Sequence, residues 1–264
     1  MGMIRCMGGF IFSICFFCCM LFWDIILHFL WLISTPLARK YEFRKVGSYA
    51  NTCFSLARVY TGMKIQYHPD LLRDLPPYFM VISNHQSFID IAYLLFAFSG
   101  HRLLFVSKES VARGIPYASP LFRLCRHALV SRSGKTGKTM SELVRIAKMA
   151  PRGYIPAVFP EGTRSRTGDL GRFHPGAVRT ILSEHPMPVA AVAVDGGYTV
   201  SGLSKLFRKM HEATYRMKVL KLYPPPQGKE DINDLLLNVK KDIQLQLQKW
   251  RGHADKYRQK IKKA

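Results

Sequence analysis

The chain has 264 residues, of which 48% are hydrophobic and 21% are charged, so it can bury the core of one large α/β domain or of two small ones. This composition excludes intrinsically disordered and collagen-like proteins. Lys and Arg number 39 against 17 Asp and Glu, which gives a formal net charge of +22 at pH 7. We therefore expect an anionic partner: a nucleic acid, an anionic membrane surface or a phosphorylated substrate.

An apolar segment near the N-terminus, residues 10–33, is interrupted mainly by Asp24 and His28 and is long enough to cross a bilayer as a helix. Basic residues follow it instead of a cleavage site, which predicts a membrane anchor with the rest of the protein at the cytoplasmic face of the inner or plasma membrane. Most of the six cysteines lie in or before this segment, which indicates a reduced, non-secreted protein.

The carboxylate of Asp24 is costly in hydrocarbon, which favours a segment that dips into one leaflet or pairs with the next helix over a plain single span. A second helix is predicted over residues 41–63, with an apolar face, so the two helices are expected to form a hairpin in the membrane interface. The alternative is that residues 10–33 form the buried core helix of a soluble domain.

After residue 64, short apolar runs alternate with amphipathic stretches, which predicts an α/β fold with a mixed central sheet covered by helices. Thr139 and Glu142 form a capping box that is expected to start one of these helices. Strands are predicted at residues 78–82, 103–106, 128–130, 155–159, 188–194 and 216–222, and helices at 88–98, 140–149, 176–183 and 232–250. The expected parts are a membrane-embedded helical hairpin (1–63), an α/β domain (64–226), and a C-terminal amphipathic helix with a basic tail (227–264).

His85 and Asp90 follow the first predicted strand of this α/β region, in the segment Asn84-His85-Gln86-Ser87-Phe88-Ile89-Asp90. A strand-to-helix turn can bring the two side chains together, so that the carboxylate holds one imidazole nitrogen and leaves the other as a base. Ser87 and Asp90 also form a capping box, so Asp90 could instead serve only the helix N-terminus. The position at the end of a buried strand favours a catalytic pair.

The sequence offers no obvious nucleophile for a covalent acyl-enzyme, because it has no G-x-S-x-G elbow and no cysteine in a suitable loop. The remaining role for a His–Asp pair is that of a general base. It would deprotonate a hydroxyl of the substrate, which then attacks an activated acyl group.

A second polar turn, Phe159-Pro160-Glu161-Gly162-Thr163-Arg164-Ser165, follows another buried strand. Gly162 permits a tight turn, Thr163 offers a hydroxyl, and the planar guanidinium of Arg164 suits a phosphate. Glu161 is expected to orient Arg164 or to accept a hydrogen bond from a substrate hydroxyl. Basic residues between the two turns, including Lys108 and Arg132, are consistent with a pocket for an anionic head group.

These motifs make the sequence similar to the glycerophospholipid acyltransferase family, whose N-H-x-x-x-x-D and F-P-E-G-T-R-S motifs both match in full. The resemblance covers roughly residues 78–195. It implies that His85 is the base, that Asp90 supports it, and that Arg164 with Lys108 binds the acceptor phosphate beside Glu161 and Gly162. It also implies an α/β sheet, an acyl-CoA or acyl-carrier-protein donor and, in some bacterial members, a two-helix element in one leaflet.

The chain departs from the family pattern on the acceptor side. The stretch 126–132 lacks the usual glycine and aspartate of G-x-x-F-x-D-R before Arg132, and residues 188–191 lack the second proline of P-x-x-P.

The predicted reaction transfers a fatty acyl chain to the free hydroxyl of 1-acylglycerol 3-phosphate (lysophosphatidic acid), forming phosphatidic acid. The expected partners include membrane lipids and no nucleic acid, and the reaction is expected to need no metal or bound cofactor. The alternatives are glycerol 3-phosphate or another lysolipid as acceptor, a lipid hydrolase, and a non-catalytic basic protein tethered to the membrane.

Overall fold

The computed structural model describes residues 2–68, 75–131, 136–200 and 210–262. Over these residues seven strands form one sheet in the order β1-β7-β6-β2-β5-β3-β4. Neighbouring strands are parallel except β6 and β7, which are antiparallel. The strands are β1 (Lys64–His68), β2 (Met80–Ser83), β3 (Arg102–Lys108), β4 (Ala128–Val130), β5 (Tyr154–Val158), β6 (Val189–Asp195) and β7 (Thr214–Tyr223).

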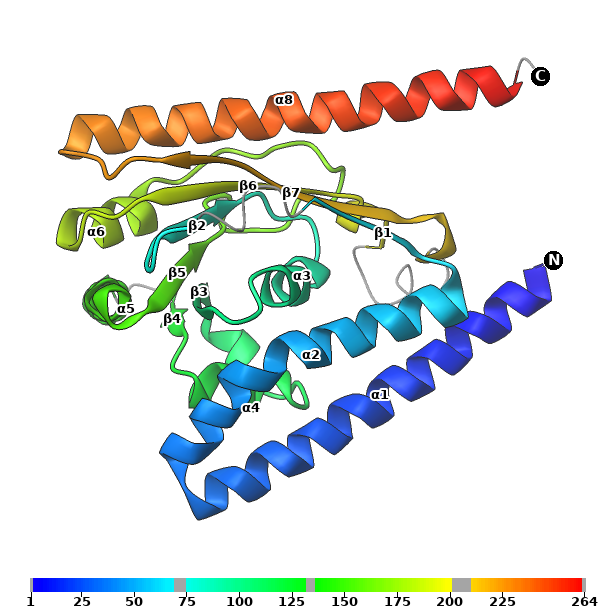
Figure 1. Ribbon diagram of the computed structural model, residues 1–264, viewed down its shortest axis with the longest axis horizontal. Helices are drawn as coiled ribbons and strands as arrows, with labels where there is room; N and C mark the ends of the chain where they lie inside the picture. Colours follow the sequence, from blue (N-terminus) through cyan, green and yellow to red (C-terminus); the bar gives the residue numbers. More distant parts are fainter. Residues whose placement is uncertain (1, 69–74, 132–135, 201–209, 263–264) are drawn as a thin grey trace.

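Helices cover both faces of the sheet, so the predicted α/β class with a mixed central sheet is confirmed (Figure 1). Alternation along the strands sends successive side chains to opposite faces: Val81 joins the core beneath the N-terminal helices, whereas Met80 and Ile82 join the core beneath the later ones. The first face carries α1 (Gly2–Ile33), α2 (Thr35–Thr61), α3 (Ile89–Ala97) and α4 (Ala118–Leu124), and the second carries α5 (Thr136–Met149), α6 (Gly176–Glu184) and α8 (Lys229–Lys262).

The N-terminal hairpin is present, and α1 and α2 lie side by side along one side of the molecule (Figure 1). At Gly8 a Cβ would lie 2.2 Å from the carbonyl oxygen of Tyr60, so only glycine allows the two backbones to approach this closely. Helix α2 begins at Thr35, earlier than predicted, because Ser34 caps it and the proline that follows is tolerated in the first turn.

Helix α1 pairs with α2, one of the two arrangements that Asp24 suggested, and Asp24 itself contacts the α/β domain. Its Oδ1 accepts a hydrogen bond of 2.8 Å from the backbone N–H of Tyr117, the residue that precedes α4. The polar group of α1 is thereby satisfied by the α/β domain, which removes much of the cost of placing a carboxylate in an apolar helix.

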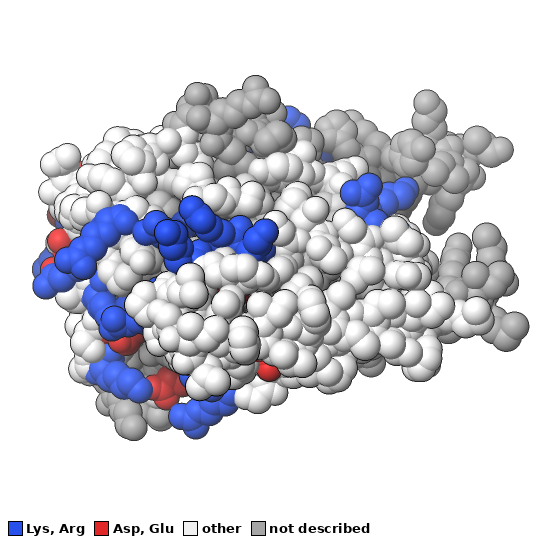
Figure 2. All heavy atoms as spheres, turned by 60° about the horizontal axis from the view of Figure 1, so that its bottom comes forward, with Lys and Arg blue, Asp and Glu red and all other residues white. Residues whose placement is uncertain are grey.

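Over Met7–Ile33, helix α1 is long and apolar enough to cross a membrane. Its buried side chains, Phe12, Trp23 and Leu27, pack on the rest of the molecule. In Figure 2 the other side of the hairpin comes forward, and a broad area without Lys or Arg is bordered by basic side chains. Large apolar side chains that α1 leaves exposed include Phe10, Ile14, Phe17, Leu21, Phe22, Ile25, Phe29 and Leu32.

One prediction of local structure was wrong, and two elements were missed. Helix α5 begins at Thr136, so Thr139 lies inside it and does not cap it. Strand β1 was missed because it is a short edge strand in which the polar residues Lys64 and Gln66 alternate with apolar ones. Helix α4 was missed because it is short and contains Pro120, which is tolerated in its first turn.

Candidate active site

The two polar turns identified in the sequence meet at one edge of the sheet. Strands β2 and β5 are parallel neighbours, with Ile82 opposite Val158, so their carboxyl ends lie side by side, where sites of α/β folds usually form. The first turn follows β2 and leads into α3, and the second follows β5. The backbone joins them directly, because the N–H of Ser165 donates to the carbonyl oxygen of His85 over 2.8 Å.

His85 and Asp90 are in contact, as the sequence predicts. Nδ1 of His85 lies 2.7 Å from Oδ2 of Asp90, and the ionised carboxylate can only accept, so Nδ1 carries the proton and Nε2 is the nitrogen that could act as a base. Asp90 is fully buried, and 15% of the His85 side chain is exposed. The imidazole also stacks on the ring of Phe159, with centroids 4.2 Å apart and planes 16° apart.

Asp90 has more partners than the imidazole. Its Oδ2 accepts the backbone N–H groups of Gln86 at 2.6 Å and Ser87 at 2.8 Å, while its Oδ1 accepts the hydroxyl of Tyr215. The two explanations of Asp90 are therefore not exclusive, because one carboxylate holds both the turn before α3 and the imidazole. These hydrogen bonds also compensate its removal from water.

Glu161 links the two turns, and this differs from the expectation that it orients Arg164. Its Oε1 accepts the N–H of His85 at 2.8 Å and its Oε2 accepts the N–H of Gly171 at 2.7 Å. Burial raises the pKa of Glu161, although both backbone hydrogen bonds favour its charged form. Glu161 thus bridges the two turns through backbone hydrogen bonds, and its predicted contact with a substrate hydroxyl stays a prediction.

The turn itself depends on Gly162, whose φ of +64° is the left-handed conformation that favours glycine. Thr163 and Arg164 line a pocket of about 350 Å³ formed by the loop that follows β5. The guanidinium carbon of Arg164 lies 3.8 Å from the ring centre of Phe88, so the aromatic face holds the cation in place. Partial burial lowers the pKa of Arg164, which remains a cation at neutral pH.

Of the other predicted binding residues, Lys108 ends β3 and is exposed. Strand β3 runs parallel to β5, so Lys108 lies at the same edge of the sheet as the two turns. Arg132 lies outside the described residues, and its predicted role stays a prediction.

Sequence reasoning missed several residues that complete the site. The side chain of Asn84 exchanges two hydrogen bonds of 2.9 Å with the backbone of Val194, which fixes the first turn to β6. Tyr215 comes from β7, 125 residues after Asp90. Gln86 donates to Asp195 at the end of β6. Asn84 and Gln86 lie inside the first motif, so their position in the sequence could have marked them as site residues. Tyr215 and Asp195 lie in no motif, and nothing in their neighbouring sequence marks them.

The chain is similar to known proteins in sequence and in fold. Residues 67–195 match the family model described as Acyltransferase. The chain is 28% identical over 155 residues to a 1-acyl-sn-glycerol-3-phosphate acyltransferase of Limnanthes douglasii. The aligned region covers 57% of this chain and 50% of that protein. It is 26% identical over 179 residues to a probable 1-acyl-sn-glycerol-3-phosphate acyltransferase of Mycoplasma genitalium. That alignment covers 62% of this chain and 63% of the other protein. The chain thus spans about half the length of the first of these relatives.

The fold has a solved counterpart in the crystal structure of the 1-acyl-sn-glycerophosphate (LPA) acyltransferase PlsC from Thermotoga maritima. The TM-score is 0.68 at 17% identity, and the match covers 95% of this chain and 96% of that one. The matched segment, residues 67–195, carries both polar turns of the candidate site, and the chain shares its fold with that acyltransferase. In sequence, the chain is similar to proteins named 1-acyl-sn-glycerol-3-phosphate acyltransferases, as its two motifs indicated.

Proposed function

We propose that the chain is an O-acyltransferase that moves a fatty acyl group from a thioester to the free hydroxyl of 1-acylglycerol 3-phosphate, forming phosphatidic acid. The observation that carries the proposal is the contact of 2.7 Å between Nδ1 of His85 and Asp90, on a turn joined to the Arg164 turn. The names of its relatives support the choice of acceptor.

In the proposed reaction Nε2 of His85 takes the proton of the acceptor hydroxyl while the oxygen attacks the thioester carbon. The C–S bond then breaks, and the departing thiolate takes the proton from the imidazolium, so that a free thiol and an ester leave the site. A positioned general base contributes about 10²–10⁴-fold, and holding both substrates together contributes further. The thioester supplies the driving force, so we propose no metal or bound cofactor, and the donor is acyl-CoA or acyl-carrier protein.

The acceptor phosphate would be held by Arg164, with Lys108 as a second cation and Thr163 as a hydroxyl donor in the same loop. Stacking on Phe88 presents the guanidinium as a planar fork, which suits two phosphate oxygens at once. The carboxylate of Glu161 faces two backbone N–H groups, so its charge is compensated before the phosphate arrives.

The exposed apolar side chains of α1 would keep this site at the cytoplasmic membrane surface. A lipid acceptor leaves the bilayer at a cost of about 0.8 kcal/mol per CH₂ group. An enzyme anchored in one leaflet by its hairpin avoids that cost, because it reaches the acceptor hydroxyl where the lipid already lies.

The test is a panel of acceptors with one labelled acyl-CoA, followed by identification of the product and measurement of released thiol. The full chain should form labelled phosphatidic acid, and thiol release should require the lysolipid. His85→Ala should lose transfer and keep its fold, whereas His101→Gln, a histidine between α3 and β3, should keep activity. Full activity of His85→Ala would remove the base, and thiol release without any acceptor would indicate a hydrolase.

A further inference from the structure

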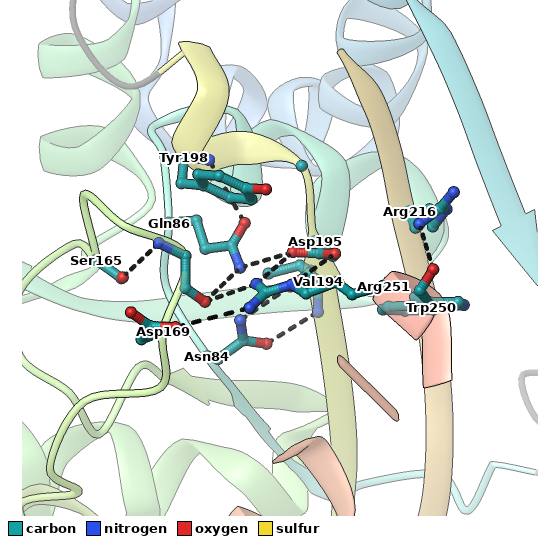
Figure 3. A network of polar contacts seen from close by, with 12 residues as sticks. Asn84, Gln86, Ser165, Asp169, Val194, Asp195, Tyr198, Arg216, Trp250 and Arg251 are labelled. Atoms are coloured by element: carbon teal, nitrogen blue, oxygen red, sulfur yellow. Dashed lines mark hydrogen bonds and ion pairs between the residues drawn. The ribbon is translucent and has the colours of Figure 1, made fainter. Parts of the chain in front are cut away.

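Helix α8 reaches the candidate active site with the side chain of Arg251 (Figure 3). Its guanidinium meets Asp195, the last residue of β6: Nη2 lies 2.8 Å from Oδ1 and Nε lies 3.4 Å from Oδ2. Only 5% of the Asp195 side chain is exposed, so this carboxylate is nearly removed from water. A buried carboxylate needs such compensation, and a planar guanidinium supplies it with defined geometry.

From Asp195 the contacts continue into the first catalytic turn. The side-chain amide of Gln86 donates to Oδ1 of Asp195 at 3.1 Å, the same oxygen that Arg251 contacts. Gln86 follows His85 directly, and its backbone N–H is one of the donors to Asp90. The position of Asp195 therefore constrains the peptide that carries the base.

Arg251 also contacts the second turn. Its Nη2 donates to the carbonyl oxygen of Gly168 at 2.7 Å. The N–H of Gly168 donates to the hydroxyl of Ser165 at 3.0 Å, and the N–H of Ser165 donates to the carbonyl of His85. Gly168 has a φ of +90°, and a Cβ there would lie 2.7 Å from the ring of Tyr198 and 2.9 Å from Nη2 of Arg251, so the loop packs closely between the guanidinium and the aromatic ring.

We propose that Arg251 is a positioning residue for the proposed acyl transfer: a clamp from the C-terminal helix that holds the His85 turn and the Arg164 loop in one relative arrangement. The inference rests on the proposed function. It assigns a role to a residue outside both motifs and outside the matched segment 67–195. Arg251 acts through Gln86 and Gly168, and it is not a catalytic residue.

The competing explanation is that Arg251 only fastens α8 to the sheet. The chain offers a matched control, because Arg216 on β7 also binds this end of α8, with Nη1 3.3 Å from the carbonyl oxygen of Trp250. Arg216 contacts Gln66 on β1 and neither of the two turns in any contact found among the described residues. Losing Arg216 thus weakens helix docking without loosening the turns.

The experiment compares full-length Arg251→Met, Arg251→Lys and Arg216→Met in detergent micelles, at a temperature where melting curves show every variant folded. Arg251→Met should lower kcat/KM for the acceptor by at least about tenfold, because displacements of about 1 Å at a site cost up to about 10²-fold. Arg251→Lys, which retains a cation for Asp195, should recover part of this loss. Arg216→Met should keep the wild-type kcat/KM. Wild-type kcat/KM in Arg251→Met, no recovery in Arg251→Lys, or an equal loss in Arg216→Met would overturn the proposal.

Hydrogen exchange separates this inference from the proposed function, since it needs no substrate. Peptides over residues 84–88 and 165–171 should exchange faster in Arg251→Met than in the wild type or Arg216→Met. Faster exchange in a protein that transfers no acyl group would refute the reaction and leave the clamp in place. Unchanged exchange in both peptides would refute the clamp itself.

Discussion

Glu42 in α2 offers a quantitative test of how the hairpin is joined to the rest of the fold. Its side chain is 1% exposed, and its carboxylate accepts the hydroxyl of Tyr117. Burial raises the pKa of Glu42 from 4.5 to about 7, against a smaller lowering by the Tyr117 hydrogen bond. The folded protein therefore keeps a proton that the unfolded chain releases between these two pH values.

The sign of the effect follows from linkage. Between pH 4.5 and about 7 the folded state binds more protons than the unfolded state, so the free energy of unfolding falls as the pH rises. Each pH unit of difference is worth about 1.4 kcal/mol, which gives a loss of about 3 kcal/mol that is complete above the folded pKa. Glu42→Gln keeps an acceptor for Tyr117 and has no carboxyl proton, so it should not show this loss.

The assay is chemical denaturation in micelles at a series of pH values from 4.5 to 8, for the wild type and Glu42→Gln. Other titrating groups act equally in both proteins, so the difference between the two free energies of unfolding should change by about 3 kcal/mol over this range. Glu184→Gln, a substitution on α6 in a surface ion pair with Lys148, is the control and should follow the wild type. Parallel curves for the wild type and Glu42→Gln would show that this carboxyl is not held protonated by burial.

Three further substitutions test the site and the anchor. Arg164→Lys should raise the KM for the phosphorylated acceptor by about tenfold with less effect on kcat, because a bidentate contact is lost; steady-state kinetics with an unchanged KM would exclude phosphate binding there. Gly171→Ala places a Cβ 2.8 Å from Oε2 of Glu161. It should lower kcat several-fold, which corresponds to about one kcal/mol in the activation barrier. The control Gly137→Ala, whose Cβ meets nothing within 4 Å, should match the wild type in the same assay. Asp24→Ala should lower the free energy of unfolding in micelles by about 1–2 kcal/mol, because it leaves the backbone N–H before α4 without its acceptor; equal stability would mean that water replaces the carboxylate.

Much of the sheet could be predicted because buried strands have a strong local signal. Strand β6 is buried at all seven positions, and its continuous apolar run requires only neighbouring residues to recognise. Strand β1 has no such run, and it is a strand because its residues pair with 214–218, some 150 residues later in the chain. A single sequence does not state such a pairing.

The candidate site divides in the same way. The contact between His85 and Asp90 could be predicted because a turn brings together residues five positions apart. The bond from Tyr215 to Asp90 and the clamp of Arg251 depend on the order of strands and the path of α8, which no local motif encodes. Glu161 shows the limit most clearly: the residue was singled out, but its contact with the N–H of His85 exists only once the two turns meet.

The stack of Phe159 on His85 has a stereochemical consequence. An imidazole nitrogen takes up a proton along its lone pair, which lies in the plane of the ring, and the phenyl ring shields one face of that plane from solvent. In the proposed reaction, an incoming alcohol would therefore approach Nε2 in the plane of the imidazole, away from the nitrogen that contacts Asp90. In the proposed reaction, the aromatic residue that follows β5 would therefore limit the directions from which an acceptor alcohol can reach the base.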